Sequence, residues 1–338
     1  MQSSSYPLGK VPVDHLARLL KTYSPPDNRL VVAGKIGEDA AVIDMGDRYL
    51  VAKTDPITFA TEEIGWYAVN VNANDVACTG AEPRWFLATI LLPGGQSPPD
   101  LVDEIFVQIA AACESLNVAL AGGHTEITYG IDRPIVVGQM LGEVAKDKLI
   151  LTGGAQPGDD ILLTKRIAIE ATAIIAGERR QELSDRYSDQ ELDRLANYIY
   201  KPGISIVPEA RIATTFDGVH AMHDPTEGGI ATGLQELALA ADVGLEIFVD
   251  NLPYDPDCLA FCQYFQLNPL GIIASGSLLL TVDPATTPSL REKLRQAHIA
   301  SAVIGQVKSA EFGIQLVDAR GGRPLPTFER DEITKIFD

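Results

Sequence analysis

Two blocks of alternating strand-like and helix-like segments, separated by a turn-rich stretch, constrain the fold of this chain most strongly. The stretch Thr152–Asp159 contains three glycines and one proline and has no apolar periodicity. We therefore place a domain boundary there, with domains over residues 1–150 and 151–338. The length of 338 residues independently predicts about two domains. Strands that alternate with helices predict an α/β or α+β sandwich in each half.

The apolar periodicities predict the individual elements. In the first block we expect helices over 13–22, 61–79 and 100–116, and strands over 30–33, 40–44, 49–53, 85–92, 118–121 and 134–144. In the second block we expect strands over 161–165, 244–249, 277–282, 302–307 and 313–316, and helices near 169–176, from 227, near 258–265 and over 289–298. A polar helical hairpin is expected before residue 200. In the first block, Asp100 is the expected N-cap of the helix over 100–116.

The charge balance excludes several classes of partner. With 27 Lys+Arg against 46 Asp+Glu, the formal net charge is −19, which argues against nucleic acid and against an anionic membrane surface. The first twenty residues have no apolar signal-peptide core, and no uncharged apolar run of 18 residues occurs, so we expect a cytoplasmic protein. The four cysteines are too few and too scattered for a disulfide framework. A zinc site at Cys258 and Cys262 is one alternative, but such thiols are more often buried as small hydrophobic groups.

The common nucleotide and nucleophile motifs are absent from the sequence. Neither Gly-Lys pair continues into a P-loop, and no G-x-G-x-x-G opens a helix after a strand. No G-x-S-x-G nucleophile elbow is present either.

Several aspartates occupy positions that plain folding does not explain. Asp75 lies on the apolar stripe of a helix that is apolar on nearly all sides, where a carboxylate is costly unless it is paired or holds a metal. The alternative is a hydrogen bond to backbone or to the neighbouring Asn72 and Asn74. Asp39 and Asp55 flank strands, where a scaffold can direct them into a cleft or where turn chemistry alone can account for them.

Glycine-rich segments accompany these acids. In Asp224-Pro225-Thr226-Glu227-Gly228-Gly229, the first four residues have the form of an acidic capping box that begins a helix at Pro225. Glycines in its first turns instead suit a backbone that approaches a ligand closely. Gly122-Gly123-His124-Thr125-Glu126 is either an exposed turn or a close approach to a ligand, with His124 and Glu126 able to contact a metal or substrate. Gly34-Lys35-Ile36-Gly37 is a short loop with one cation, adequate for a triphosphate.

These signals share one chemical logic. Hard carboxylates without Cys or His partners suit Mg²⁺, which often bridges to substrate phosphates. Several acids without a P-loop suggest a nucleotide held mainly through metal, with phosphoryl transfer by positioning and charge neutralisation.

The motifs resemble, in order, those of the PurM-like superfamily of ATP-dependent enzymes, over about residues 32–317. This superfamily includes aminoimidazole ribonucleotide synthetase, thiamine-monophosphate kinase, selenophosphate synthetase and the hydrogenase-maturation protein HypE. The resemblance rests on five segments: residues 37–42, Thr54-Asp55, residues 74–81, residues 122–125 and residues 224–229. It implies an α+β, two-domain fold with an N-terminal domain that pairs with its twin into a β-barrel and a C-terminal α/β sandwich.

The resemblance also implies an ATP- and Mg²⁺-dependent enzyme that works as a homodimer. Asp39, Asp55, Asp75 and Asp224 would hold Mg²⁺, and Asp75, His124 and Asp224 would be catalytic. The nucleotide would contact Lys35, Gly37, Asp39, Thr54, Asp55, Gly122, Gly123, Thr125 and Gly228.

Residues 222–232 and 64–75 are most similar to the HypE branch, which passes the ATP γ-phosphate to a carbamoyl group. That branch carries the group on a C-terminal cysteine, whereas the last cysteine here is Cys262. We therefore expect transfer to an amide- or carbonyl-type oxygen of a small substrate or carbamoyl group, with a maturation protein as a further partner. The alternatives are a kinase of a phosphorylated metabolite, with Arg84, Lys165 or Arg166 near the γ-phosphate, and a non-catalytic nucleotide-binding paralogue.

Overall fold

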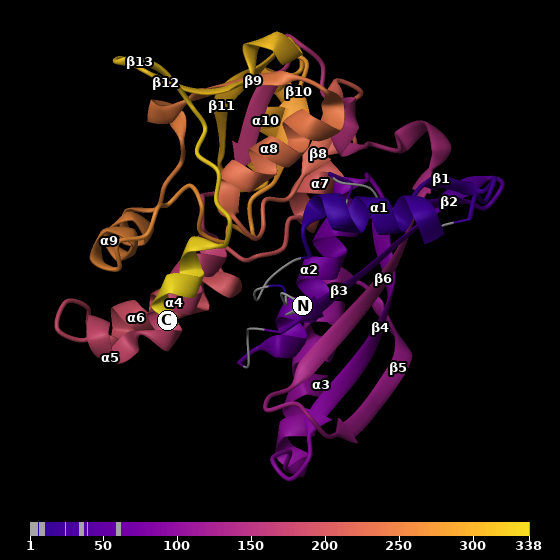
Figure 1. Ribbon diagram of the computed structural model, residues 1–338, viewed down its shortest axis with the longest axis vertical. Helices are drawn as coiled ribbons and strands as arrows, with labels where there is room; N and C mark the ends of the chain where they lie inside the picture. Colours follow the sequence, from indigo (N-terminus) through magenta and orange to yellow (C-terminus); the bar gives the residue numbers. More distant parts are fainter. Residues whose placement is uncertain are drawn as a thin grey trace, which may run out of the picture.

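The fold is described from a computed structural model, in which residues 6, 11–23, 25–33, 37–38, 40–58 and 62–337 are placed. The structure has two β-sheets, one from each half of the chain, and helices lie beside each of them (Figure 1). A helix, α1 (Val13–Tyr23), precedes the first sheet. The α+β fold class predicted from the sequence is confirmed, and none of the helices in these residues is long and apolar enough to span a bilayer.

The first sheet has six strands in the order β1-β2-β3-β6-β4-β5. All neighbours pair antiparallel except β4 and β5, which are parallel. The strands are β1 (Leu30–Val32), β2 (Ala41–Asp44), β3 (Arg48–Ile57), β4 (Glu82–Pro93), β5 (Ala119–Thr128) and β6 (Ile135–Ala145). Two helices, α2 (Ile64–Cys78) and α3 (Pro99–Leu116), cover one face of this sheet (Figure 1).

The second sheet has seven strands in the order β13-β12-β9-β11-β7-β10-β8. These strands are β7 (Asp160–Thr164), β8 (Val219–His223), β9 (Gly244–Phe248), β10 (Leu279–Val282), β11 (Ser301–Lys308), β12 (Ile314–Asp318) and β13 (Gly321–Pro324). The helices are α4 (Ile169–Glu178), α5 (Arg180–Leu183), α6 (Asp189–Ala196), α7 (Val207–Ala213), α8 (Gly229–Ala241), α9 (Pro256–Tyr264) and α10 (Thr287–Gln296). A short 3-10 helix, η6 (Glu332–Ile336), lies near the end of the chain.

Helix α2 connects the two halves of the molecule. Thirteen of its residues are buried, as the apolar pattern on both of its sides predicts. One face packs on the first sheet, while α7 and residues of β7, β8 and β10 join the same hydrophobic core. The side chain of Asn74 donates to the Ile204 carbonyl oxygen and accepts from the Ile206 amide, both at 2.9 Å, which fixes the chain before α7 against α2.

Two predictions of where a helix begins and which residue caps it are wrong. The helix after β8 begins at Gly229 rather than Pro225, with Gly228 at its N-cap, so Asp224 does not cap it. Gly228 and Gly229 have φ of 76° and 66°, and a Cβ on Gly229 would lie 2.6 Å from two backbone carbonyl oxygens. This left-handed close approach excludes a helical turn there. Helix α3 begins at Pro99 with Pro98 at its N-cap, so Asp100 is inside the helix.

The structure also contains elements that the patterns did not predict. Helix α7 and strand β8 lie between residues 207 and 223 and are short, with seven and five residues. The sequence of β8 contains two histidines, yet nearly all of its residues are buried. It therefore lacks the alternation of apolar and polar residues by which a strand is usually predicted.

Candidate active site

Three charged side chains meet between β3 and the last turn of α2. The Lys53 ammonium lies 2.8 Å from Asp75 Oδ2 and 3.5 Å from Asp55 Oδ2. The Asp75 side chain is 5% exposed and that of Asp55 40%. A buried carboxylate needs such a partner, because desolvation without compensation is expensive. Lys53 was not predicted from the sequence, although strand alternation places it on the same face of β3 as Asp55.

Asp224 approaches the same helix from the C-terminal half of the chain. The Cys78 thiol donates to Asp224 Oδ1 at 3.5 Å, and both residues are buried. Cys78 lies three residues after Asp75, on the same side of α2. We call Lys53, Asp55, Asp75, Cys78 and Asp224 the acid site. It joins three of the four aspartates that the motifs single out, and the fourth, Asp39, lies outside the described residues.

The backbone around the acid site is tightly held. Asn72 Nδ2 donates to the carbonyl oxygens of Ala68 at 2.8 Å and Asp55 at 3.3 Å, which ties α2 to β3. The Thr54 hydroxyl donates to the Gly138 carbonyl oxygen at 2.9 Å. Thr54 alternates with Lys53 and Asp55 and so lies on the opposite face of the sheet.

The loop 224–229 is fixed by a residue near the end of the chain. The Asp331 carboxylate accepts from the amides of Gly228 at 2.7 Å, Ile333 at 2.8 Å and Ile273 at 3.1 Å. Burial raises the pKa of Asp331, and these three amides lower it in part. The Gly228 amide, predicted to contact the nucleotide, therefore donates to Asp331. No sequence pattern singled out Asp331.

The first glycine motif packs against α8. A Cβ on Gly37, whose φ is 81°, would lie 2.8 Å from the Ala240 Cβ and 3.1 Å from the Glu236 carbonyl oxygen. The neighbouring Glu38 accepts from the Gly153 amide at 3.3 Å. These contacts bring the motif onto the C-terminal half of the chain. Lys35, the predicted cation of this loop, is outside the described residues.

The glycine pair of the fourth motif lies inside a strand rather than a turn. Residues 122–126 belong to β5, the exposed edge strand of the first sheet. A Cβ on Gly123 would lie 1.9 Å from the Ala88 carbonyl oxygen of β4, whereas one on Gly122 would meet nothing within 4 Å. The pair thus permits close strand pairing where the chain has φ of 140° and 150°.

His124 and Glu126 do not join the acid site within one chain. They pair in register with Thr89 and Leu91 of β4, whose neighbours Ala88 and Ile90 are buried against the helices. Both side chains therefore lie on the sheet face away from α2 and α3. Their side chains are 66% and 52% exposed, and His124 Nε2 lies 3.3 Å from Glu126 Oε2. Thr125 alternates to the opposite face from them.

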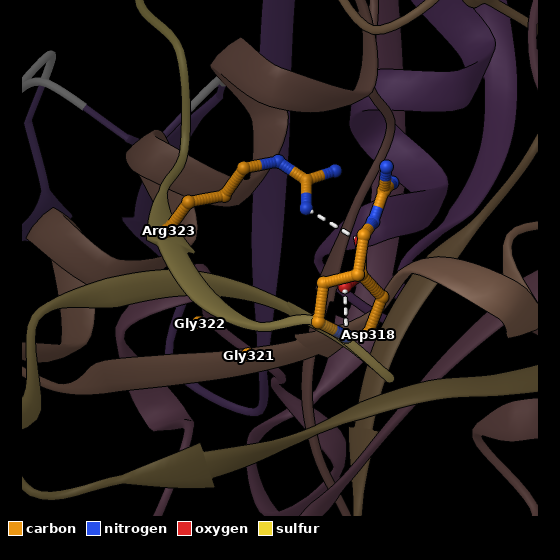
Figure 2. A pocket seen from close by; sticks show the side chains of 5 residues that line it. Asp318, Gly321, Gly322 and Arg323 are labelled. Atoms are coloured by element: carbon orange, nitrogen blue, oxygen red, sulfur yellow. Dashed lines mark hydrogen bonds and ion pairs between the residues drawn. The ribbon is translucent and has the colours of Figure 1, made fainter.

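A surface pocket at the β12–β13 hairpin lies far from these residues. It is lined by Asp318, Arg320, Gly321, Gly322 and Arg323. Figure 2 shows the Arg323 guanidinium directed at the Asp318 carboxylate, 2.7 Å away. The hydrogen bond from Arg323 is the main reason why the pKa of Asp318 falls to about 2. None of the residues that line this pocket is among the site residues predicted from the sequence.

The described residues contain no three His, Cys, Asp or Glu side chains that converge closely enough to hold a metal ion by themselves. Cys258 and Cys262, for which a zinc site was one alternative, are free, buried thiols in the hydrophobic core of the C-terminal half of the chain.

Two family models match most of the chain. They describe the N-terminal domain of AIR synthase related proteins, over residues 37–144, and the C-terminal domain of the same proteins, over residues 156–316.

Two curated proteins illustrate the similarity in sequence. A putative hydrogenase expression/formation protein of Methanocaldococcus jannaschii is 27% identical over 316 residues, which cover 87% of this chain and 90% of that protein. The carbamoyl dehydratase HypE of Cupriavidus necator is 27% identical over 310 residues, covering 86% of this chain and 85% of that protein.

Solved structures share the fold. A HypE–HypF complex gives a TM-score of 0.75 at 20% identity, covering 92% of this chain and 98% of that chain. HypE in complex with ATP gives 0.71 at 24% identity, covering 96% and 97%. ThiL complexed with AMPPCP and TMP gives 0.69 at 20% identity, covering 92% and 94%. At these identities the likeness establishes the two-domain fold.

Proposed function

The chain belongs to the AIR synthase related family, and on that premise we propose that it is an ATP-dependent enzyme which transfers the γ-phosphate to an amide or carbonyl oxygen. The observation that carries this proposal is the acid site. Two carboxylates, Asp55 and Asp75, lie around one largely buried ammonium, and a third, Asp224, accepts from the Cys78 thiol one helical turn after Asp75 on α2. Folding alone gains little from such an arrangement, since buried ion pairs are often no more stabilising than apolar residues of similar volume.

Nucleotide binding is supported by the fold and by the chemistry of the acid site. The structural neighbours include HypE with ATP and ThiL with AMPPCP. Mg²⁺ fits the donor set, because Asp55 and Asp75 supply hard carboxylate oxygens and this ion is usually bound by one or two carboxylates plus substrate phosphates. Asp55 and Asp75 would hold it, and the ion would neutralise charge on the triphosphate. The other predicted ligands, Asp39 and Asp224, remain predictions.

Within this mechanism the residues of the chain position and neutralise charge. Lys53 pairs with both Asp55 and Asp75, and its ammonium would add positive charge beside the phosphates of a nucleotide held at these carboxylates. Asp331 accepts from the Gly228 amide and so helps to fix the left-handed turn that follows Asp224. Phosphoryl transfer requires this kind of pre-arranged electrostatics more than covalent chemistry.

The acceptor we propose is a carbamoyl or other primary amide group, since the similar curated proteins include carbamoyl dehydratases. The second candidate is a kinase of a phosphorylated metabolite, which the likeness to ThiL with TMP supports. A non-catalytic paralogue is the third, and the acid site argues against it because a regulator needs no such buried charge.

We also propose a homodimer that completes the site. The first sheet leaves one face without helices, which we call the open face. It carries a largely apolar set of half-buried or exposed side chains, namely Ile43, Leu50, Trp85, Leu87, Leu91, Val137 and Leu141. A second copy on the open face would cover them and enclose Thr54, His124 and Glu126. A maturation protein as a further partner rests on the likeness to the HypE–HypF complex.

The test measures ATP binding by calorimetry and ADP release with carbamoyl and phosphorylated acceptors. Asp75→Asn should reduce ATP-dependent turnover by at least about a hundredfold, in line with removal of one pre-arranged charge from a transition state. Asp100→Asn, an exposed aspartate of α3, is the matched control and should behave as the parent protein. Equal turnover in both variants would refute the assignment, and release of ADP only with phosphorylated acceptors would favour the kinase.

A further inference from the structure

The segment 325–336 follows β13 and ends in the short 3-10 helix η6. It runs from the second sheet toward α4 (Figure 1). The side chains of Leu325, Ile333 and Ile336 are buried in the hydrophobic core of the C-terminal half of the chain. These apolar side chains anchor the segment, so its polar groups are held in fixed places along its length.

The segment is attached to the loop 268–274, which lies between α9 and β10. Glu332 Oε2 accepts from the Asn268 amide at 2.8 Å, and the Glu332 amide donates to the Gly271 carbonyl oxygen at 3.0 Å. The Phe328 ring packs on Gly271, where a Cβ would lie 2.5 Å from ring atoms. The position of this loop therefore depends on the segment that lies against it.

The loop 268–274 is in turn joined to the residues that begin α8. The Ala231 amide donates to the Leu270 carbonyl oxygen at 3.0 Å, and the Ala274 amide donates to the Thr226 carbonyl oxygen at 3.2 Å. The two connections lie on either side of the glycine pair in the turn before α8. A displacement of the loop would therefore be passed on to this turn.

Asp331 binds both of these loops and its own segment at once. Its Oδ2 atom accepts from the Gly228 amide at 2.7 Å, while Oδ1 accepts from the amides of Ile273 at 3.1 Å and Ile333 at 2.8 Å. An ionised carboxylate accepts at both oxygens and has no proton to donate, so it suits three converging N–H groups. Hydrogen bonds to a charged group are also stronger than those between neutral groups.

The turn held by Asp331 carries a carboxylate of the acid site. Asp224 lies four residues before Gly228 in the sequence, and it is 2% exposed. Its Oδ1 atom accepts from the Cys78 thiol of α2 at 3.5 Å. A group that acts on a reacting centre must be held to within about 0.5 Å, and the residues that support it set this precision.

We propose that Asp331 is a positioning residue for the reaction: it holds Asp224 against α2, so that the docked segment 325–336 controls the acid site from a distance. This inference rests on the proposed function, because it assigns a regulatory contact to that site. Asp331 acts through Gly228 and Asp224 and is not itself catalytic. When the segment is docked, the acid site is complete. When the segment is displaced, the turn loses its bond to Asp331 and Asp224 no longer keeps its place beside Cys78.

The test uses Asp331→Asn, which has the same shape but presents an NH₂ group in place of one of the two acceptor oxygens. The first measurement is the rate at which N-ethylmaleimide labels Cys78, followed by mass spectrometry without nucleotide and well below the Tm of each variant. Cys78 labelling should become at least about tenfold faster than in the parent protein, as expected when one hydrogen bond to a charged group no longer opposes local opening. Labelling of Cys113, a buried thiol of α3, should not change. Glu329→Gln, an exposed acid of the same segment, is the matched control and should label as the parent does.

The contrast between the two thiols separates a positioning role from a structural one. If Asp331→Asn unfolds, or if Cys78 and Cys113 become reactive together, Asp331 stabilises the whole fold and the proposal is overturned. Unchanged labelling of Cys78 overturns it as well. Asp331→Glu keeps a carboxylate that can accept at both oxygens, and its Cys78 labelling should lie between those of the parent protein and Asp331→Asn.

The second measurement is ATP-dependent turnover in a double-mutant cycle. Asp331→Asn should lower turnover at least about tenfold in the parent protein, but by less than about twofold when Asp224→Asn is already present, because the two residues act through one contact. Equal losses in both backgrounds would mean that Asp331 does not act through Asp224. Absence of turnover in the parent protein would refute the proposed function, whereas the labelling of Cys78 would still decide whether Asp331 holds Asp224 in place.

Discussion

Asp75 in α2 and His124 in β5 both come from short polar motifs, yet the Asp75 side chain is 5% exposed and the His124 side chain 66%. The acid site is closed within one chain, because α2 is packed between the two halves of the molecule and its carboxylates have partners. Strand β5 is the reverse, an edge strand whose residues are nearly all exposed. Exposed edge strands are usually covered by another element or chain. Because β5 also carries one of the polar motifs, we expect a second subunit to pack over it. The difference between the two regions therefore separates what one chain completes from what a second copy would supply.

Mixing two inactive variants tests this comparison most directly. Asp75→Asn removes a carboxylate of the acid site, and His124→Ala removes the imidazole of the motif in β5. If each site combines Asp75 of one subunit with His124 of the other, a random mixture should regain about a quarter of the parental ATP-dependent turnover, because half the dimers are mixed and one of their two sites is intact. The measurement is ADP release after unfolding and refolding the two variants together. Turnover no greater than that of either variant alone would mean that both residues act within one subunit or that no dimer forms.

Lys53→Met should destabilise the closed region strongly. Lys53 is the ammonium between Asp55 and Asp75, and its removal leaves the buried Asp75 carboxylate without that charge. We expect a loss of about 3 kcal/mol in the free energy of unfolding, measured by urea denaturation.

The matched control is Lys146→Met, which breaks the 2.6 Å pair with Asp44 on the surface and should change stability by less than about 1 kcal/mol. The double variant Lys53→Met/Asp75→Asn should recover part of the loss. A Lys53 variant as stable as its control would contradict the view that the acid site is held by charge pairing.

Gly123→Ala tests how tightly the edge strand is attached. Its Cβ would overlap the Ala88 carbonyl oxygen at 1.9 Å, so β5 must separate from β4 at that point. We expect a loss of about 2 to 3 kcal/mol in unfolding free energy, together with a lower dimer fraction in light scattering. Gly122→Ala shares the positive φ but meets no atom within 4 Å, and it should cost distinctly less. Equal effects of the two variants would attribute the glycine pair to backbone strain alone.

The sequence predicts the acid site better than the edge strand β5, for physical reasons. Asp75 stands out because α2 is apolar on nearly all sides, so a carboxylate there needs a special cause. Asp224 stands out only through its motif, and the capping box suggested by Pro225 and Glu227 is wrong. Local pattern rules cannot detect that Gly228 and Gly229 adopt left-handed conformations, because the backbone that leaves no room for a side chain at Gly229 comes from residues 270–272.

Residues that act over long sequence separations had the weakest signals. Asp331 fixes the loop around Gly228 from 103 positions away, and no periodicity or motif connects the two. Lys53 could have been found from its i, i+2 spacing to Asp55 on one strand. Glu170 could have been found as a charge followed by a run of mostly apolar residues in α4, a signal similar to that of Asp75 in α2.

The pH dependence of stability should follow from the buried carboxylate of Glu170 in α4 and not from the exposed groups of the edge strand β5. Burial raises the pKa of Glu170 from the ordinary 4.5 to about 7, so the folded state holds a proton that the unfolded state has already released. The stabilisation is fully present below about pH 4.5 and is lost as the pH rises through 7. Between pH 5 and 7 the free energy of unfolding should therefore fall by about 2 kcal/mol on account of this group. Urea denaturation at a series of pH values measures it. Glu170→Gln should flatten this part of the curve, whereas Glu126→Gln, whose parent side chain is 52% exposed on β5, should leave it unchanged. An equal slope in Glu170→Gln and the parent protein would place the proton elsewhere and would remove the contrast in electrostatics between the two regions.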